Sequence, residues 1–214
     1  MRRVFNMNKR RATAFFSVLL AAALFFPSAL RAQDSGDDEV LQPAPNMFIG
    51  PVLGKFLPSD AVFKQVYGNG GSILGFQAGW HFFRSDVFSL ALCLDIRDFS
   101  QEGASTITGT ASTITLKALS FGLEAHLQRG VVGLWLGGGV VSVSYAETSA
   151  LQDTTDSTAG FHIDGGMIFQ IPSFPLAALK LYARWSKAVV TLADFEADVG
   201  GTEYGVSLLF RFKI

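Results

Sequence analysis

The final stretch of the chain, YGVSLLFRFKI from Tyr204 to Ile214, alternates between two kinds of side chain. Every second residue is apolar: Tyr204, Val206, Leu208, Phe210, Phe212 and Ile214. The positions between them include Ser207, Arg211 and Lys213. A period of two is typical of a β-strand, because successive side chains point to opposite faces. The stretch therefore predicts an amphipathic strand with one face suited to hydrocarbon.

The N-terminus has the order of a secretory signal peptide. Five Lys and Arg residues and no acid lie in residues 1–11, and an apolar run follows at 12–26. Pro27 and a short segment ending in Ala32 follow the apolar run. Residues 1–32 are therefore predicted to be a signal peptide cleaved after Ala32. A membrane-anchoring helix is the alternative, but the run is shorter than the roughly 20 residues that span a bilayer.

Removal of residues 1–32 leaves an acidic chain. Six of the 17 Lys and Arg residues lie there and none of the 18 Asp and Glu residues, so 11 cations remain against 18 anions, a net charge of −7. This balance argues against a nucleic-acid partner. Residues 33–45, QDSGDDEVLQPAP, predict a flexible acidic lead. The single cysteine, Cys93, excludes an intrachain disulfide.

Residues 46–214 divide into eight alternating segments, which predict strands at about 46–57, 72–83, 87–97, 114–127, 131–146, 159–171, 176–190 and 203–214. Three connections are short, and four, at 58–71, 98–113, 147–158 and 191–202, are longer and mostly polar. Short turns at one end and long loops at the other are typical of an outer-membrane barrel. The sequence therefore predicts an all-β fold, an eight-stranded antiparallel transmembrane up-and-down β-barrel.

The two faces of these segments differ in size and polarity. The bulky apolar set suits a lipid-facing surface, because the interior of an eight-stranded barrel is narrow. The opposite face predicts a polar lumen network of Gln77, His81, Asp95, Arg97, Glu124, His126, Asp164, Lys180, Tyr182, Arg184 and Arg211. In the segment 131–146 both faces are apolar or glycine, and we expect Leu134, Leu136 and Val140 outside and Trp135 inside.

Together these features resemble the small eight-stranded outer-membrane β-barrels of the OmpA/OmpX type and their OmpW-like relatives. The resemblance covers residues 46–214 and rests on pattern. It implies a location in the cell outer membrane, with its lipids and the barrel-assembly machinery as partners. It also implies that Tyr204, Phe210, Phe212 and Ile214 form the assembly signal, although the family commonly ends on an aromatic residue and this chain ends on Ile214.

The residue pattern predicts no cofactor, no metal site and no catalytic residue. The three histidines, His81, His126 and His162, lie on alternate strands and lack a ligand-spacing motif. Ser120, Glu124 and His126 share a face, but roughly 20 Å of strand separates Ser120 from His126, so they cannot form one triad.

The expected function is therefore non-enzymatic. It is a structural or surface-interaction role through four long extracellular loops, with a possible extracellular ligand there. Two alternatives stay open: a narrow channel for small or hydrophobic solutes, and a lipid A-modifying enzyme with residues from other strands.

Overall fold

The computed structural model describes residues 45–104, 109–149, 153–192 and 195–213. Most of them lie in strands: β1 (Met47–Pro58), β2 (Gly71–Arg84), β3 (Phe88–Ala104), β4 (Ala111–Arg129), β5 (Val132–Ser149), β6 (Asp153–Gln170), β7 (Ala177–Leu192), β8 (Phe195–Asp198) and β9 (Gly201–Phe212). A helix, α2 (Ala61–Tyr67), joins β1 to β2. The predicted signal peptide, residues 33–44 of the predicted lead, and Ile214 lie outside the described residues.

The strands close into an antiparallel ring, which confirms the predicted barrel. Strands β1 to β6 pair in sequence, β6 pairs with β7, β7 with β9, and β9 with β1. In the closing pair, Met47 lies opposite Phe212 and Pro58 opposite Gly201. Closure matters in lipid because an open edge would leave backbone N–H and C=O groups without partners. Strand β8 pairs only with the end of β7, so it adds a hairpin arm to the eight-stranded ring.

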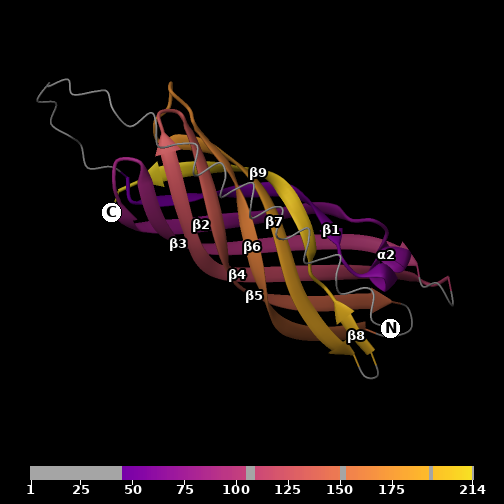
Figure 1. Cartoon of the computed structure of the whole chain (residues 1–214). Coiled ribbons are helices and arrows are strands. Elements are labelled where there is room, and N and C mark those ends of the chain that lie inside the picture. The colour runs from indigo at the N-terminus through magenta and orange to yellow at the C-terminus, as the bar shows by residue number, and fades with distance from the viewer. Residues whose placement is uncertain (1–44, 105–108, 150–152, 193–194, 214) are drawn as a thin grey trace, which may run out of the picture. The chain divides into compact units, whose positions relative to one another are not determined.

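The two ends of the barrel differ in their connections (Figure 1). At one end, residues 85–87, 130–131 and 171–176 form the predicted short turns, and Gly130 takes a positive φ of 62°. We call this the turn end. Helix α2 and strand β8 lie at the opposite end, the loop end (Figure 1).

Two of the four long loops predicted at the loop end, 98–113 and 147–158, are mostly strand. Strand β3 continues to Ala104 and β4 begins at Ala111, so most of 98–113 is paired strand. Strands β5 and β6 likewise leave only residues 150–152 between them. The physical reason is composition: these segments are rich in Ser and Thr, and threonine favours a pleated sheet even where it is polar. The segment 191–202 carries β8.

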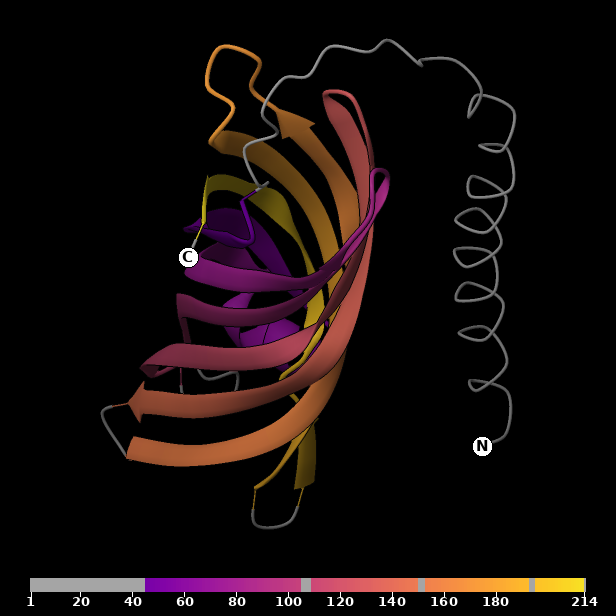
Figure 2. The same ribbon diagram turned by 90° about the vertical axis from the view of Figure 1, so that its left-hand side faces the viewer.

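The segment 58–71, also predicted as a loop, contains helix α2. Asp60 caps its first turn by accepting hydrogen bonds from Val62 N at 2.8 Å and Phe63 N at 2.9 Å. Gly68, with a φ of 80°, ends the helix. Phe63 and Tyr67 are buried, and α2 lies within the curve of the sheet (Figure 2). No helix in the described ranges is both long and apolar enough to cross a membrane.

The outer surface carries a band of large apolar side chains. Members on β2, β3 and β4 include Leu74, Phe76, Trp80, Leu94, Ile96, Leu119, Phe121 and Leu123, all well exposed. Toward the loop end the outward positions become polar, with Lys55, Asp98, Lys117 and Lys187 on four strands. These residues mark the outer edge of the apolar band. An exposed band of this kind suits hydrocarbon rather than water.

Candidate functional site in the barrel lumen

The lumen holds nearly all of the polar residues selected from the sequence. Ten of the eleven are buried, with exposed fractions of 8% or less: Gln77, His81, Asp95, Arg97, Glu124, His126, Asp164, Lys180, Tyr182 and Arg184. Arg211 is only half-buried, and the ion pairs of the described residues do not include it.

The first group, which we call the arginine cluster, consists of Asp95, Arg97, Ser120, His162, Asp164, Tyr182, Arg184 and Glu203. Arg184 donates to Asp95 Oδ2 at 2.5 Å and to Asp164 Oδ2 at 2.7 Å, so one guanidinium joins strands β3, β6 and β7. Arg97 pairs with Glu203 and lies 3.4 Å from Asp95 Oδ1. Its Cζ also lies 4.7 Å from the centre of the Tyr182 ring. Buried charges need such partners because each one has lost its water.

The second group, the lysine cluster, consists of Gln77, Glu124, Trp135, Lys180 and Ser207. Lys180 Nζ donates to Glu124 Oε1 at 2.6 Å and to Gln77 Oε1 at 3.2 Å. It also lies 3.6 Å from the centre of the Trp135 ring, which fits a cation–π contact. Trp135 is 3% exposed, so it faces the lumen, as expected.

Two of the histidines pack together toward the turn end. The rings of His81 and His126 lie 5.1 Å apart, and Phe48 covers both. Gly79 leaves room for this arrangement, since a Cβ there would overlap the Phe48 ring. His126 Nε2 lies 3.0 Å from Glu124 Oε2, while His162 belongs to the arginine cluster. Among the described residues no group of three or more His, Cys, Asp or Glu side chains is arranged to hold a metal ion.

The structure separates the members of the trio considered as a catalytic triad. Ser120 Oγ accepts from Arg184 Nη1 at 3.4 Å, whereas Glu124 pairs with His126 and Lys180. A triad requires the serine hydroxyl to lie within hydrogen-bond reach of the histidine base. Ser120 therefore lies in the arginine cluster, whereas His126 contacts Glu124 of the lysine cluster.

The predicted lumen network lacked four polar members of these clusters: Ser120 and His162, which the sequence analysis considered only for a triad or a metal site, and Glu203 and Ser207. Glu203 accepts from Tyr182 Oη at 2.5 Å and pairs with Arg97, and Ser207 donates to Pro51 O at 2.7 Å. The signal was present in the terminal strand, because Glu203, Gly205 and Ser207 share one parity with Arg211. Glu203 is the first residue of the predicted strand 203–214, so following the inward face to that end of the strand would have found it.

Sequence reasoning also missed an apolar cluster that fills the loop end of the lumen. We call it the aromatic cap; it comprises Phe56, Phe63, Tyr67, Ile73, Phe99, Ile114, Leu116, Val141, Val143, Tyr145, Ala188, Val190 and Val199. The Phe99 ring lies 5.1 Å from Phe56 and 6.4 Å from Phe63, so it links the barrel wall to α2. These side chains give the loop end a packed interior of the kind found in soluble proteins.

A carboxylate fixes helix α2 to the opposite wall. Glu147 accepts from the hydroxyls of Tyr67 and Tyr145 and, at 2.9 Å, from Ser112 Oγ. Glu147 lies beyond the edge of the apolar band, because Lys117 at that edge pairs with Ser144. Burial acts to raise the pKa of Glu147, but the three hydroxyls outweigh it and hold the pKa below its usual range. Burial, with Glu147 beside it, raises the pKa of Tyr67.

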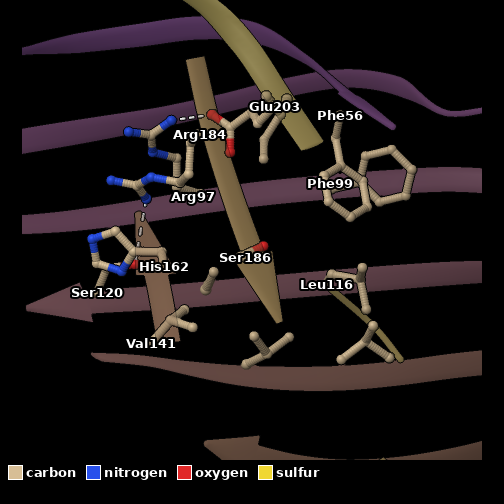
Figure 3. A pocket seen from close by; sticks show the side chains of 14 residues that line it. Phe56, Arg97, Phe99, Leu116, Ser120, Val141, His162, Arg184, Ser186 and Glu203 are labelled. Carbon is tan, nitrogen blue, oxygen red and sulfur yellow. Dashed lines mark hydrogen bonds and ion pairs between the residues drawn. The ribbon is translucent and has the colours of Figure 1, made fainter. Parts of the chain in front are cut away.

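A cavity of about 40 Å³ lies where the aromatic cap meets the arginine cluster. Figure 3 shows Arg97, Ser120, His162 and Arg184 gathered on one side and Phe56, Phe99 and Leu116 on the other. Within the described chain, three buried side-chain nitrogens have no hydrogen-bond partner, and two of them, Arg97 Nε and His162 Nδ1, belong to residues that line this cavity.

Comparison of this arrangement with solved structures identifies the fold. Neisserial surface protein A is 12% identical, with a TM-score of 0.60, and the match covers 80% of this chain and all of that one. The outer membrane protein OprG from Pseudomonas aeruginosa is 13% identical, with a TM-score of 0.58, and the match covers 80% of this chain and 97% of that one. The chain has the fold of a small outer-membrane β-barrel. No protein-family model and no curated protein matches the sequence.

The apolar band and this fold together place the barrel in an outer membrane, as predicted. Tyr204, Phe210 and Phe212 are exposed in the band on β9, where hydrocarbon would cover them. Their role as an assembly signal, together with Ile214, stays a prediction.

Proposed function

We propose that this protein is a non-enzymatic, non-conducting barrel that acts at the surface of a Gram-negative-type cell. Outer-membrane lipids would surround its apolar band, and the barrel-assembly machinery would insert it by reading its final strand. The proposal rests above all on one observation: paired, buried charges cross the lumen within the membrane-spanning part of the barrel.

The lumen clusters support a closed barrel. Arg184 connects β7 to β3 and β6, and Lys180 connects β7 to β2 and β4, so salt bridges and hydrogen bonds reach across the interior. Opening a path for ions would separate buried partners, and an unpaired buried charge is strongly unfavourable. An eight-stranded barrel is also only wide enough for its own side chains.

The strand extensions support a surface role. Strands β3 and β4 continue beyond Asp98 and Lys117 to Ala104 and Ala111, and β5 and β6 extend in the same way. The six residues from Phe99 to Ala104 correspond to about 20 Å of strand. A rigid polar sheet that projects past the lipid can offer backbone edges and hydroxyl groups to a ligand outside the cell.

Thiol labelling tests the orientation that this proposal requires. Asp156→Cys lies on exposed β6 at the loop end, and Ser85→Cys lies in an exposed turn at the opposite end. On intact cells an impermeant thiol reagent should label the Asp156→Cys variant and leave the Ser85→Cys variant unlabelled. Labelling in the reverse order would place the hairpins in the periplasm and end the surface proposal.

Conductance tests the closed lumen. Purified protein inserted into a planar lipid bilayer should give no stepwise current, whereas a porin inserted under the same conditions should. Adherence of cells to serum-coated glass tests the surface role, with a variant whose β3–β4 hairpin is shortened as the comparison. Stable current steps, or equal adherence by the two strains, would count against the corresponding half of the proposal.

A second candidate is a passage for small apolar solutes. The observation that favours it is the aromatic cap, which lines the loop end of the lumen with Phe56, Phe99 and other apolar side chains. Faster uptake of a small aromatic hydrocarbon by producing cells, without any ionic current, would favour this role. In that case the solute would leave the lumen before it reached the charged clusters, since they offer it no apolar path.

A further inference from the structure

Two of the three lysines that mark the outer edge of the apolar band lie close together in the ring. Strand β9 lies between β7 and β1, so Lys187 on β7 and Lys55 on β1 are separated by a single strand. Lys117 lies on β4, three strands away from β1. All three side chains are exposed on the outer face. The outer surface of β7, β9 and β1 therefore carries two cations at the edge of the lipid.

On each of these three strands the outer face changes from an apolar or aromatic residue to a polar one. Toward the loop end the change takes one outward position, in the pairs Leu53 and Lys55, Trp185 and Lys187, and Tyr204 and Thr202. Tryptophan and tyrosine are enriched where a membrane meets water. Trp185 and Tyr204 therefore place the two lysines and Thr202 at the level of the lipid headgroups.

The two lysines lack a partner of opposite charge in the part of the chain that the structure describes. The ion pairs found there include neither Lys55 nor Lys187. Lys117 differs, because it lies directly opposite Asp98 on β3. Opposite charges at such cross-strand positions attract each other. The positive charge of Lys55 and Lys187 is thus available to an anion, whereas that of Lys117 is offset.

An acid near the β8 arm is already engaged. Asp198 lies opposite Val189 on β7. Its carboxylate accepts hydrogen bonds from Ser59 Oγ at 2.9 Å and from Gly200 N at 2.9 Å. It therefore holds the arm against the barrel and forms no ion pair with Lys187.

The register of the strands gives the spacing of the two lysines. Lys55 lies opposite Tyr204, which lies opposite Ala183, and Lys187 is four residues beyond Ala183. Four residues correspond to about 13 Å of strand, and β7 and β1 are roughly 10 Å apart, so the two Cα atoms are about 16 Å apart along the wall. A headgroup with a phosphate at each end fits this spacing, because each lysine can contact one phosphate.

We propose that this surface, which we call the lysine ridge, binds an outer-leaflet lipid whose headgroup carries two phosphates. Lys55 and Lys187 each bind one phosphate as a point charge. Thr202 donates a hydrogen bond to the headgroup between them, and the acyl chains continue over Trp185 and Tyr204 into the apolar band. Charge and apolar contact then act together, as they do in other membrane-surface sites. This inference rests on the orientation of the proposed function, in which the loop end meets the outer leaflet.

Native mass spectrometry of the full-length mature protein in detergent micelles tests this site, because it counts the lipid copies that stay bound. The lipids compared are lipid A with two phosphates, lipid A with one phosphate, and phosphatidylethanolamine. We expect one tightly bound copy of the two-phosphate lipid. The one-phosphate form should bind about fivefold more weakly, which is the effect of one lysine at an anionic membrane surface. Phosphatidylethanolamine has no net charge and should bind at least 25-fold more weakly.

Variants assign the binding to the two lysines. Lys55→Gln and Lys187→Gln should each weaken the two-phosphate lipid about fivefold, and the double variant about 25-fold. Each single variant should bind the one-phosphate and two-phosphate lipids nearly equally, because one phosphate has lost its partner. Arginine at both positions should preserve binding, since the charge is kept. The matched control is Lys117→Gln, which removes a cation from the same edge and should change binding less than twofold.

Heat-dependent gel mobility checks that each variant is folded. If Lys117→Gln weakens binding as much as Lys55→Gln does, general surface charge attracts the lipid and the lysine ridge is not a site. Equal binding of the one-phosphate and two-phosphate lipids by the unchanged protein, or no retained copy, also overturns the proposal. Binding in micelles does not depend on which end faces outside. It can therefore fail while thiol labelling supports the surface role, and the reverse outcome is equally distinct.

Discussion

The two halves of strand β4 carry their apolar side chains on opposite faces. Toward the turn end, Leu119 and Phe121 point outward while Ser120 and Glu124 are buried inside. Beyond Lys117 the pattern inverts, and Ile114 and Leu116 are the buried residues while Thr113 and Thr115 lie on the outer face.

The inversion recurs on β5. Val141, Val143 and Tyr145 are buried in the aromatic cap, and Ser142 and Ser144 are exposed. The backbone and its pairing run through the change without a break. The solvent outside the barrel therefore decides which face is apolar: in the lipid the wall is apolar and the lumen polar, and above the lipid the barrel is built like a soluble protein.

We call the part of the barrel within the apolar band the membrane half, and the part beyond Lys117 the soluble half. The largest expected effect comes from disrupting the ion pairs of the membrane half. Arg184→Leu would leave Asp95 and Asp164 buried without their shared cation, at a loss of about 3–5 kcal/mol of unfolding free energy. Urea unfolding in lipid vesicles, followed by tryptophan fluorescence, measures it. Lys55→Leu, which removes an exposed cation at the edge of the band, is the control and should change little. Equal losses would mean that the ion pairs of Arg184 do not add to the free energy of unfolding.

A second pair of variants locates the inversion on β4. Phe121→Arg puts a cation in the apolar band and should lower the unfolding free energy by about 2–4 kcal/mol if Phe121 lies near the bilayer midplane. Thr115→Arg lies on the same face of the same strand beyond Lys117 and should change it by no more than about 0.5 kcal/mol. The same unfolding assay applies. A large loss for Thr115→Arg would place the edge of the lipid farther toward the loop end.

The inversion also explains what the sequence did and did not reveal. Within the lipid, strict alternation between bulky apolar and small or polar side chains identified the strands, their faces and the barrel. In 131–146 both faces read as apolar because the segment spans the edge: Leu134 and Leu136 face out below it, and Val141 and Val143 face in above it.

Beyond the edge, the sequence was harder to interpret. Ser and Thr on the outer face made 98–113 and 147–158 resemble loops, although Ile114 and Leu116 keep the period of two. The contacts of Tyr67 with Glu147 and of Arg97 with Glu203 join distant parts of the chain, and no local pattern specifies them. Only the register of the closed sheet brings them together.

The contact of α2 with the wall offers a smaller test in the soluble half. Tyr67→Phe removes a hydroxyl that hydrogen bonds to Glu147 and Ser112. The free energy needed to separate α2 from the barrel wall should therefore fall by about 1–2 kcal/mol. A spin label on Gln65→Cys, an exposed position on α2, should become more mobile in electron paramagnetic resonance spectra. Tyr204→Phe, on the outer face of β9, should leave the label unchanged. An immobile label in the Tyr67→Phe variant would mean that apolar packing alone holds the helix.

The smallest expected effect is a response of the same contact to acid. The pKa of Glu147 is held below its ordinary value by the hydroxyls of Tyr145, Tyr67 and Ser112, so its carboxylate stabilises the folded loop end. A carboxylate whose pKa is lower in the folded protein than in the unfolded chain stabilises the fold fully at a pH above the unfolded pKa, which is about 4.3 for Glu. This stabilisation is lost as the pH falls through the pKa of the folded state. The spin label on Gln65→Cys should therefore gain mobility as the pH drops below about 4.

The Glu147→Gln variant identifies the group responsible, because glutamine does not titrate. Its label should be more mobile at neutral pH and should respond less to acid. An unchanged acid response in the Glu147→Gln variant would show that Glu147 is not the group responsible. The barrel should keep its heat-dependent gel mobility at each pH, since Arg184 and Lys180 form ion pairs with the buried carboxylates of the membrane half. If acid instead unfolded the barrel before it freed α2, the loop end would not be the weaker half, and the contrast between the two ends of β4 would not extend to stability.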